Sequence, residues 1–227
     1  MTGVGPAAVM LVTDRRRLSP AARTTHDELL ALERLLDSAV EAGVDLIQIR
    51  ERDLDAGAVT TLARSVAARA RATRVLINDR IDIALAGGVH GVHLRADGIA
   101  ATRARQLAPD GWLLGRSVHA PVDATRLGAG ADYLLFGTVF PSVSKPEGPA
   151  AGLEALRAVV QAVTLPVMAI GGITPERAGA CIGAGAAGVA SIGAFLPEAT
   201  GRDSLGVRRA TDAFRAAMAV VPTPRRA

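Results

Sequence analysis

Short apolar runs alternate along this chain with longer segments in which apolar residues recur every three to four positions. Eight runs have the β-rich, apolar character of buried strands, and they are Val9–Thr13, Leu46–Arg50, Val75–Asn78, Gly91–Leu94, Leu113–Ser117, Tyr133–Phe136, Val167–Ile170 and Gly188–Ser191. The helical period predicts helices at Asp27–Ala42, Ala58–Arg71, Asp82–Ala86, Ala100–Leu107, Val122–Leu127, Gly152–Val163, Pro175–Ala184 and Leu205–Ala219. Strict alternation predicts a parallel sheet, and eight units favour closure into a single (β/α)8 TIM barrel of the α/β class.

The length of the chain agrees with this fold. It has 227 residues, which is typical of one such barrel, and no linker divides it, so we expect one domain over residues 1–227. A doubly wound fold would place a glycine-rich phosphate loop after its first strand. Here Asp14 and three arginines follow the first strand, and we expect a charged loop over Arg15–Thr25.

Composition narrows the classes of function. Hydrophobic residues make up 49% of the chain, and aromatic residues only 3%, which disfavours nucleic-acid binding by base stacking. No apolar run is long enough to span a membrane, no signal peptide is evident, and the single cysteine, Cys181, suits a reducing compartment. We therefore expect a cytoplasmic protein that binds neither nucleic acid nor membranes, and the net charge of +4 suits an anionic substrate.

Glycine-rich turns follow the last two predicted strands. They are Gly171-Gly172 and Ser191-Ile192-Gly193. Backbone amides there can bind an anion, and two such loops are typical of the phosphate site of a (β/α)8 barrel. The alternative is that these glycines only serve tight turns.

Polar residues follow the other predicted strands, at the end that forms the active site in this fold. They include Gln48, Arg50, Arg52, Asn78, Asp79, His93, Asp97, Ser117, His119, Ser142, Ser144 and Lys145. The cations suit a polyanion, although they can equally be surface charges, and Gln48 and His93 can be satisfied interior groups. Asp79 and Asp97 are either helix caps or Mg²⁺ ligands. His119 is either an ordinary loop residue or an acid/base.

Seven motifs in order resemble one known family. They are Gln48-Ile49-Arg50-Glu51-Arg52, Asn78-Asp79-Arg80, Gly91-Val92-His93-Leu94, Asp132-Tyr133, Gly137 to Phe140-Pro141, Ser144-Lys145 and Ala169-Ile170-Gly171-Gly172-Ile173. Together they resemble the thiamine phosphate synthase family, which includes a relative, the thiazole tautomerase.

The resemblance to the synthases implies a transferase of thiamine biosynthesis. Such an enzyme couples hydroxymethylpyrimidine diphosphate with thiazole phosphate and releases diphosphate, with Mg²⁺ as cofactor. It implies catalytic roles for Arg50, Lys145 and Ser117 and a metal site at Asp79 and Asp97. The implied substrate-binding residues are Gln48, Arg52, Asn78, Ser142, Ser144, Gly172, Ser191 and Ile192. Barrels of this kind often pair, so a homodimer is a candidate assembly.

One departure from the synthase pattern keeps an alternative open. Synthases usually continue Gly-Gln-Glu-Asp after the His-Leu pair, whereas this chain reads Arg95-Ala96-Asp97-Gly98, with the acid one position early. The segments around Arg50–Arg52 and Gly115–His119 look more like the tautomerase, an isomerase that needs no metal and would use His119 as acid/base. A third hypothesis is a non-catalytic protein that binds a phosphorylated ligand.

Overall fold

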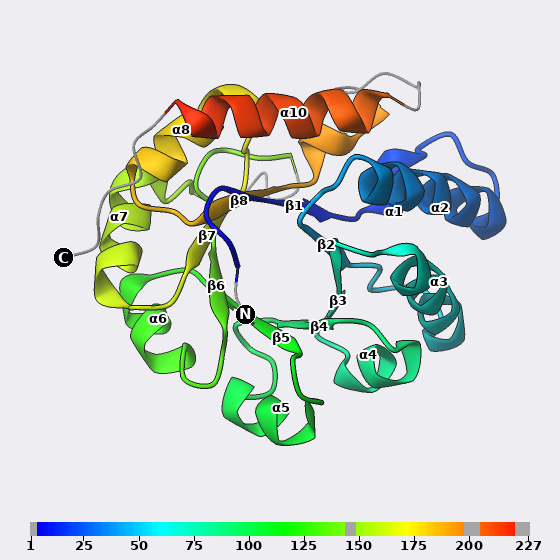
Figure 1. Ribbon diagram of the computed structural model, residues 1–227, viewed down its shortest axis with the longest axis horizontal. Coiled ribbons are helices and arrows are strands. Elements are labelled where there is room, and N and C mark those ends of the chain that lie inside the picture. Colours follow the sequence, from blue (N-terminus) through cyan, green and yellow to red (C-terminus); the bar gives the residue numbers. More distant parts are fainter. Residues whose placement is uncertain (1–3, 144–148, 198–204, 221–227) are drawn as a thin grey trace.

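The computed structural model describes residues 4–143, 149–197 and 205–220 of the chain. Within them, eight parallel strands form a closed barrel in which each strand pairs with the next and the last pairs with the first (Figure 1). The strands are β1 Ala8–Val12, β2 Leu46–Ile49, β3 Arg74–Asn78, β4 Gly91–Leu94, β5 Leu113–Val118, β6 Tyr133–Phe136, β7 Val167–Ile170 and β8 Gly188–Ser191. The predicted fold class is therefore confirmed.

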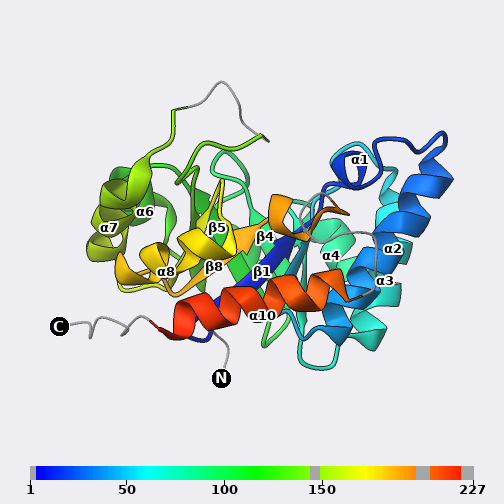
Figure 2. The same ribbon diagram turned by 90° about the horizontal axis from the view of Figure 1, so that it is seen from above.

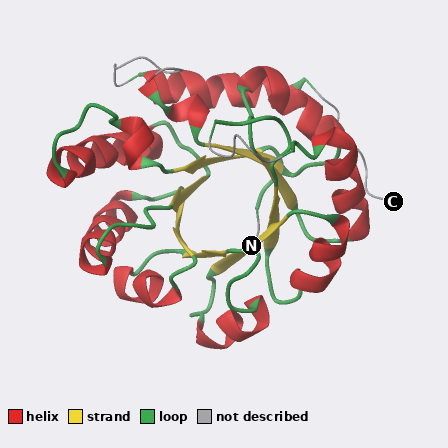
Figure 3. Cartoon of the chain, turned by 180° about the vertical axis from the view of Figure 1, so that it is seen from behind, coloured by secondary structure: helices red, strands yellow, loops and turns green. Residues whose placement is uncertain are grey.

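Helices surround the barrel on its outer side (Figures 1 and 3). They are α1 Arg15–Leu18, α2 Thr25–Glu41, α3 Ala56–Arg69, α4 Ile81–Gly87, α5 Ala101–Leu107, α6 Pro121–Leu127, α7 Gly152–Ala162, α8 Pro175–Gly183, the 3₁₀ turn η1 Gly193–Phe195 and α10 Gly206–Ala219. The prediction of a loop over Arg15–Thr25 was wrong at its start, because α1 forms there. The turn η1 was also not predicted.

Local sequence signals explain where several helices begin. Thr24 and Asp27 form a reciprocal capping box at the start of α2, and α6 and α8 each begin with a proline in the first turn. Such prolines fit because the first backbone N–H groups of a helix have no partner inside the helix. In the described part of the chain, no helix is long and apolar enough to cross a membrane.

The strands bury both of their faces, as parallel barrels require. Outward-facing residues such as Val9, Leu11 and Ile47 pack against the helices. Inward-facing residues form a second apolar cluster inside the barrel. Met10, Leu76, Tyr133 and Met168 belong to this inner cluster and have no exposed surface. We call these four residues the interior plug, since they fill the barrel below the carboxyl ends of the strands.

Helix α1 is held over the carboxyl ends of β1 and β2 by buried Arg15. The Arg15 guanidinium donates hydrogen bonds to Glu28 (2.8 Å), Glu51 (3.2 Å) and Asp53 (2.5 and 3.0 Å). Asp14 caps the helix by accepting the backbone N–H of Arg17. Seen from the side, α1 rises at the same end of the barrel as the connection after β6 (Figure 2). That end carries the candidate site.

Candidate active site

A cavity of about 710 Å³ opens at the carboxyl end of the barrel. Its lining includes side chains or backbone from all eight strands or the connections that follow them. Eleven residues predicted from sequence border it, namely Gln48, Arg50, Arg52, Asn78, Asp97, Ser117, His119, Ser142, Gly172, Ser191 and Ile192. The structure therefore brings these residues together around one cavity, and their roles there stay a prediction. Ser144 and Lys145 lie outside the described residues.

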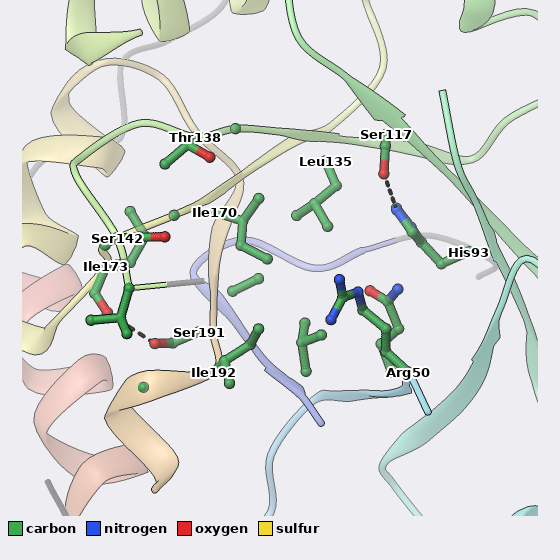
Figure 4. Close-up of a pocket in the computed structure, with 18 of the residues that line it drawn as sticks. Arg50, His93, Ser117, Leu135, Thr138, Ser142, Ile170, Ile173, Ser191 and Ile192 are labelled. Carbon is green, nitrogen blue, oxygen red and sulfur yellow. Dashed lines mark hydrogen bonds between the residues drawn. The ribbon is translucent and has the colours of Figure 1, made fainter. Parts of the chain in front are cut away.

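Two sides of this cavity differ in chemistry. Strands β2 to β5 contribute what we call the polar wall, which consists of Gln48, Arg50, Asn78, His93 and Ser117. Strands β6 to β8 and β1 contribute the apolar wall, which consists of Val12, Leu135, Ile170, Ala190 and Ile192. Arg50, His93 and Ser117 face Leu135, Ile170 and Ile192 across the open space (Figure 4). A ligand here meets hydrogen-bonding groups on one side and a dry surface on the other.

Gln48 and Asn78 form the floor of the polar wall. The Gln48 amide Nε2 donates to Asn78 Oδ1 over 3.0 Å, which fixes the orientation of both side chains. Gln48 Oε1 is buried and has no hydrogen-bond partner in the structure. A buried acceptor without a donor is costly, so this oxygen is suited to accept a hydrogen bond from a ligand.

Arg50 is the main cation of the polar wall. Its backbone N–H donates to Thr13 Oγ1 (2.9 Å), which ties the ends of β1 and β2 together. Its guanidinium makes no hydrogen bond or ion pair with any residue that the structure describes. Burial lowers the pKa of Arg50, and the neighbouring charge of Arg52 lowers it further. Arginine nevertheless stays protonated, so a partly buried positive charge faces the cavity and forms no ion pair with a described residue.

The two glycine-rich turns meet beside the apolar wall and form a backbone cup. The cup consists of Gly171-Gly172 after β7 and Ser191 to Gly193 after β8, and all of these residues border the cavity. Within the described chain, neither Gly172 nor Gly193 donates its N–H in a hydrogen bond. Ser191 Oγ donates to the Ile173 carbonyl (2.9 Å) and accepts the Ala194 N–H (3.2 Å), so this side chain joins the two turns (Figure 4). Free amides in such a cup can bind a phosphate.

The glycines of the β7 turn have a steric reason of their own. Gly172 has φ of +61°, and a Cβ there would lie 2.4 Å from the Pro141 carbonyl oxygen. The connection after β6 packs against this turn through hydrogen bonds from Val139 N–H to Ile170 and from Phe140 N–H to Gly171. Close approach of protein backbone therefore requires glycine here, in addition to any contact with a ligand.

The two predicted metal ligands lie on adjacent loops but differ in their setting. Asp97 borders the cavity and forms an ion pair with Arg95 (2.5 Å). Asp79 lies beside the lining and accepts the Arg95 N–H through Oδ1 (3.2 Å). A Cβ at Gly98, the position where synthases usually carry an acid, would lie 2.4 Å from Asp79 Oδ1. The present loop therefore brings its backbone close to the Asp79 carboxylate, and a side chain at position 98 would require that carboxylate to move.

Arg116 supports the loop that carries Asp97. Its guanidinium donates to the carbonyls of Ala96 (2.9 Å) and Ile99 (2.5 Å). Burial lowers the pKa of Arg116, and the charges of Asp79 and Asp97 oppose that shift. Both carboxylates thus interact with this one cation, and the bonds of Arg116 to Ala96 and Ile99 fix the loop that carries Asp97.

His119 borders the cavity from the connection after β5. Its Nδ1 lies 2.5 Å from the Gly137 carbonyl oxygen, so Nδ1 carries the proton and donates it. The other ring nitrogen, Nε2, makes no hydrogen bond with a described residue. The geometry leaves a histidine with one free ring nitrogen at the edge of the site.

Two arginines of the lining were missed by the sequence-based prediction. Arg17 of α1 reaches the cup, because a Cβ at Gly193 would lie 3.9 Å from Arg17 Nη2. Arg177 of α8 donates to the Gly172 carbonyl (2.7 Å) and lies over the ring of Phe140 at 4.9 Å. Arg17 belongs to the run Arg15–Arg17. This cluster of positive charge was the one feature of the sequence that could have pointed to Arg17. Nothing in the local sequence around Arg177 distinguishes it from a surface residue of a helix.

Comparison with known proteins agrees with this site. The family model for thiamine monophosphate synthase matches residues 10–195. The thiamine-phosphate synthase of Methanoculleus marisnigri is 40% identical over 180 residues, covering 77% of this chain and 82% of that protein. The thiamine-phosphate synthase of Roseiflexus sp. strain RS-1 is 36% identical over 206 residues, covering 87% of this chain and 84% of that protein.

A solved structure shows the same relationship. Thiamine phosphate pyrophosphorylase from Pyrococcus furiosus superposes with a TM-score of 0.76 and 29% identity, covering 94% of this chain and 96% of that one. The family match contains all of the residues that line the cavity, from Val12 to Ala194. The chain belongs to the thiamine monophosphate synthase family.

Proposed function

We propose that this protein is a thiamine-phosphate synthase. It would couple hydroxymethylpyrimidine diphosphate with thiazole phosphate and release diphosphate. The observation that carries the proposal is that the polar wall and the backbone cup face each other within one cavity. The chain that forms this cavity belongs to the synthase family. Two phosphorylated rings need two anion sites joined by one dry space, and this cavity is suited to both.

The cup would bind the phosphate of the thiazole substrate. The amides of Gly172, Ile192 and Gly193 would donate to its oxygens, with Ser191 holding the two turns together, and the Arg17 guanidinium would add a positive charge from α1. The thiazole ring would then pack against Ile170 of the apolar wall, which lies between Leu135 and the cup (Figure 4).

The polar wall would bind the pyrimidine diphosphate. The bond from Gln48 Nε2 to Asn78 orients the Gln48 amide. Gln48 Oε1 would then accept a hydrogen bond from the pyrimidine. Arg50 and Arg52 would neutralise the diphosphate. Ser142 borders the same space, and we assign Ser144 and Lys145 to the diphosphate on the family resemblance.

The chemistry of the acidic residues fits Mg²⁺. Among the described residues, no three His, Cys, Asp or Glu side chains gather into a metal site. Mg²⁺ is usually held, however, by one or two carboxylates together with substrate phosphates and water. Asp79 and Asp97 each keep one carboxylate oxygen that bonds to no described residue, so they would hold the ion. When bound, Mg²⁺ would supply positive charge to the leaving diphosphate.

The protein's own part in the reaction follows from these positions. The bond between the pyrimidine methylene carbon and the diphosphate oxygen breaks, and the electron pair leaves with the diphosphate. Arg50 stabilises the charge that develops on that oxygen. The thiazole nitrogen then forms the new C–N bond with the carbocation. The apolar wall excludes water that would otherwise capture this cation, and the cup holds the nitrogen within reach of it.

Turnover with both substrates tests the proposal. The purified protein should release diphosphate and form thiamine phosphate only when both substrates and Mg²⁺ are present. Asp79→Asn should abolish the release, while Asp110→Asn, at an exposed position, should behave as the unchanged protein. No product in the presence of Mg²⁺ would contradict the proposal.

The isomerase alternative is an outcome of the same test. The relatives described above carry synthase names, so the comparisons give the tautomerase no support. If the protein isomerises thiazole carboxylate phosphate without metal, and His119→Ala loses this activity, the protein is a tautomerase and the synthase proposal is wrong.

A further inference from the structure

A buried histidine links two hydroxyl groups inside the barrel. His93 of β4 is 1% exposed. Its Nδ1 lies 2.9 Å from the Tyr133 hydroxyl of β6, and its Nε2 lies 2.8 Å from Ser117 Oγ of β5. Figure 4 shows the imidazole pointing at the Ser117 hydroxyl at the edge of the cavity. Tyr133 belongs to the interior plug, so the chain of groups runs from the core to the ligand space.

The strand register brings these groups into one row. His93 pairs with Gly115, and Gly115 pairs with Tyr133. A Cβ at Gly115 would lie 2.3 Å from the Tyr133 hydroxyl and 2.4 Å from His93 Nδ1. Only glycine at this position lets the Tyr133 side chain reach across β5 to His93. The contact therefore depends on the absence of a side chain at Gly115.

The direction of the hydrogen bonds follows from protonation. The His93 ring is buried, both of its nitrogens meet hydroxyl groups, and no carboxylate of the described residues bonds to it. A charged imidazolium would have no counter-ion there, so the ring is neutral and has one N–H. Burial raises the pKa of Tyr133, so the phenol keeps its proton.

The bonding capacity of each group then leaves one arrangement that satisfies all three. The Tyr133 hydroxyl has no acceptor other than His93 Nδ1 among the described residues. An O–H donor in the core must be used, so it donates to Nδ1, and the single ring proton is on Nε2. That N–H donates to Ser117 Oγ. The proton of Ser117 is left to point into the cavity.

We propose that Tyr133 and His93 form a positioning relay that holds Ser117 as a hydrogen-bond donor toward an anionic phosphate oxygen of the ligand. The relay rests on the proposed function, in which that oxygen belongs to the departing diphosphate. Without the relay, Ser117 would be free to donate its proton to the imidazole instead. His93 borders the cavity but is almost completely buried, and both of its ring nitrogens are used by Tyr133 and Ser117. In the relay, His93 and Tyr133 therefore act on the ligand through the serine hydroxyl.

The tautomer of His93 in the free protein is the first test. In ¹⁵N-labelled protein, the signals of His93 are assigned by their loss in His93→Gln. The relay requires protonated Nε2 and unprotonated Nδ1. Protonated Nδ1 would overturn it, whether or not the protein turns over substrate.

The second test is a double-mutant cycle on the affinity for inorganic diphosphate with Mg²⁺, measured by calorimetry. Ser117→Ala should weaken binding about tenfold, the order expected for a lost hydrogen bond to a charged group. Tyr133→Phe should weaken binding several-fold, about threefold to fivefold, by freeing the imidazole. In the Ser117→Ala background, Tyr133→Phe should have no further effect.

Matched controls separate the relay from loss of structure and from failure of the synthase assignment. Ser38→Ala, on α2 away from the cavity, should leave the affinity unchanged. Thermal unfolding checks that each variant is folded. Additive losses in the double variant would overturn the relay, because they would mean that Tyr133 acts on the site by another route. Because neither test uses turnover, absence of synthase activity would contradict the proposed function separately.

Discussion

The two walls of the cavity use the same barrel geometry for opposite purposes. Strands β2 to β5 end in side chains that carry charge or hydrogen-bonding groups, whereas β6 to β8 and β1 end in apolar side chains and glycine turns. On the polar wall, recognition depends on side chains such as Arg50 and Gln48. On the other side, the anion site is made of backbone amides, and its shape depends on which residues lack a Cβ. Substitutions should therefore act differently on the two sides.

The largest expected effect is loss of activity at the polar wall. Arg50→Ala should lower kcat/KM about 10²–10³-fold, since it removes the cation that faces the leaving group. Stability should change little, because the guanidinium makes no hydrogen bond or ion pair with the described residues. Steady-state kinetics and thermal unfolding measure the two quantities. Arg71→Ala, at an exposed position outside the cavity, is the control, and equal loss in both variants would refute the role given to Arg50.

The backbone cup should respond in stability as well as in binding. Gly172→Ala places a side chain at φ of +61° and 2.4 Å from the Pro141 carbonyl oxygen. We expect a loss of about 2 kcal/mol in the free energy of unfolding, together with a higher KM for thiazole phosphate. Chemical denaturation and kinetics measure these effects. Gly111→Ala, also at positive φ but with no atom near its Cβ, separates backbone strain from the close approach of the loop after β6. An equal destabilisation of both variants would mean that the close approach has no cost.

The smallest expected effect concerns α1, which lies at the cup. Arg17→Ala should raise the KM for thiazole phosphate about fivefold with little change in kcat, because it removes a partly screened charge near the phosphate. The helix itself should persist, since Asp14 bonds the backbone N–H of Arg17. Arg16→Ala is the neighbouring control, because Arg16 pairs with Asp53 and does not border the cavity. A fall in kcat without a change in KM would contradict the proposal that Arg17 helps to bind the phosphate at the cup.

Sequence reasoning identified the barrel because its apolar runs are short, regular and separated by helical segments. It also grouped most residues of the polar wall, since residues such as Asn78 and Arg50 end a strand or directly follow one. It missed α1 because four residues carry no periodicity, and the helix is held by Arg15 contacts to Glu51 and Asp53 that only the folded chain creates. The steric reasons for Gly115 and Gly172 likewise arise from neighbouring strands and loops, so no local pattern reveals them.

The interior plug has a consequence for how ligands reach this site. Met10, Leu76, Tyr133 and Met168 are completely buried, so a ligand cannot pass from the cavity down through the barrel axis. Both substrates and both products must then exchange through one mouth. A ligand beside Gln48 therefore enters and departs on the same side as a ligand at the cup, so the two molecules share one route.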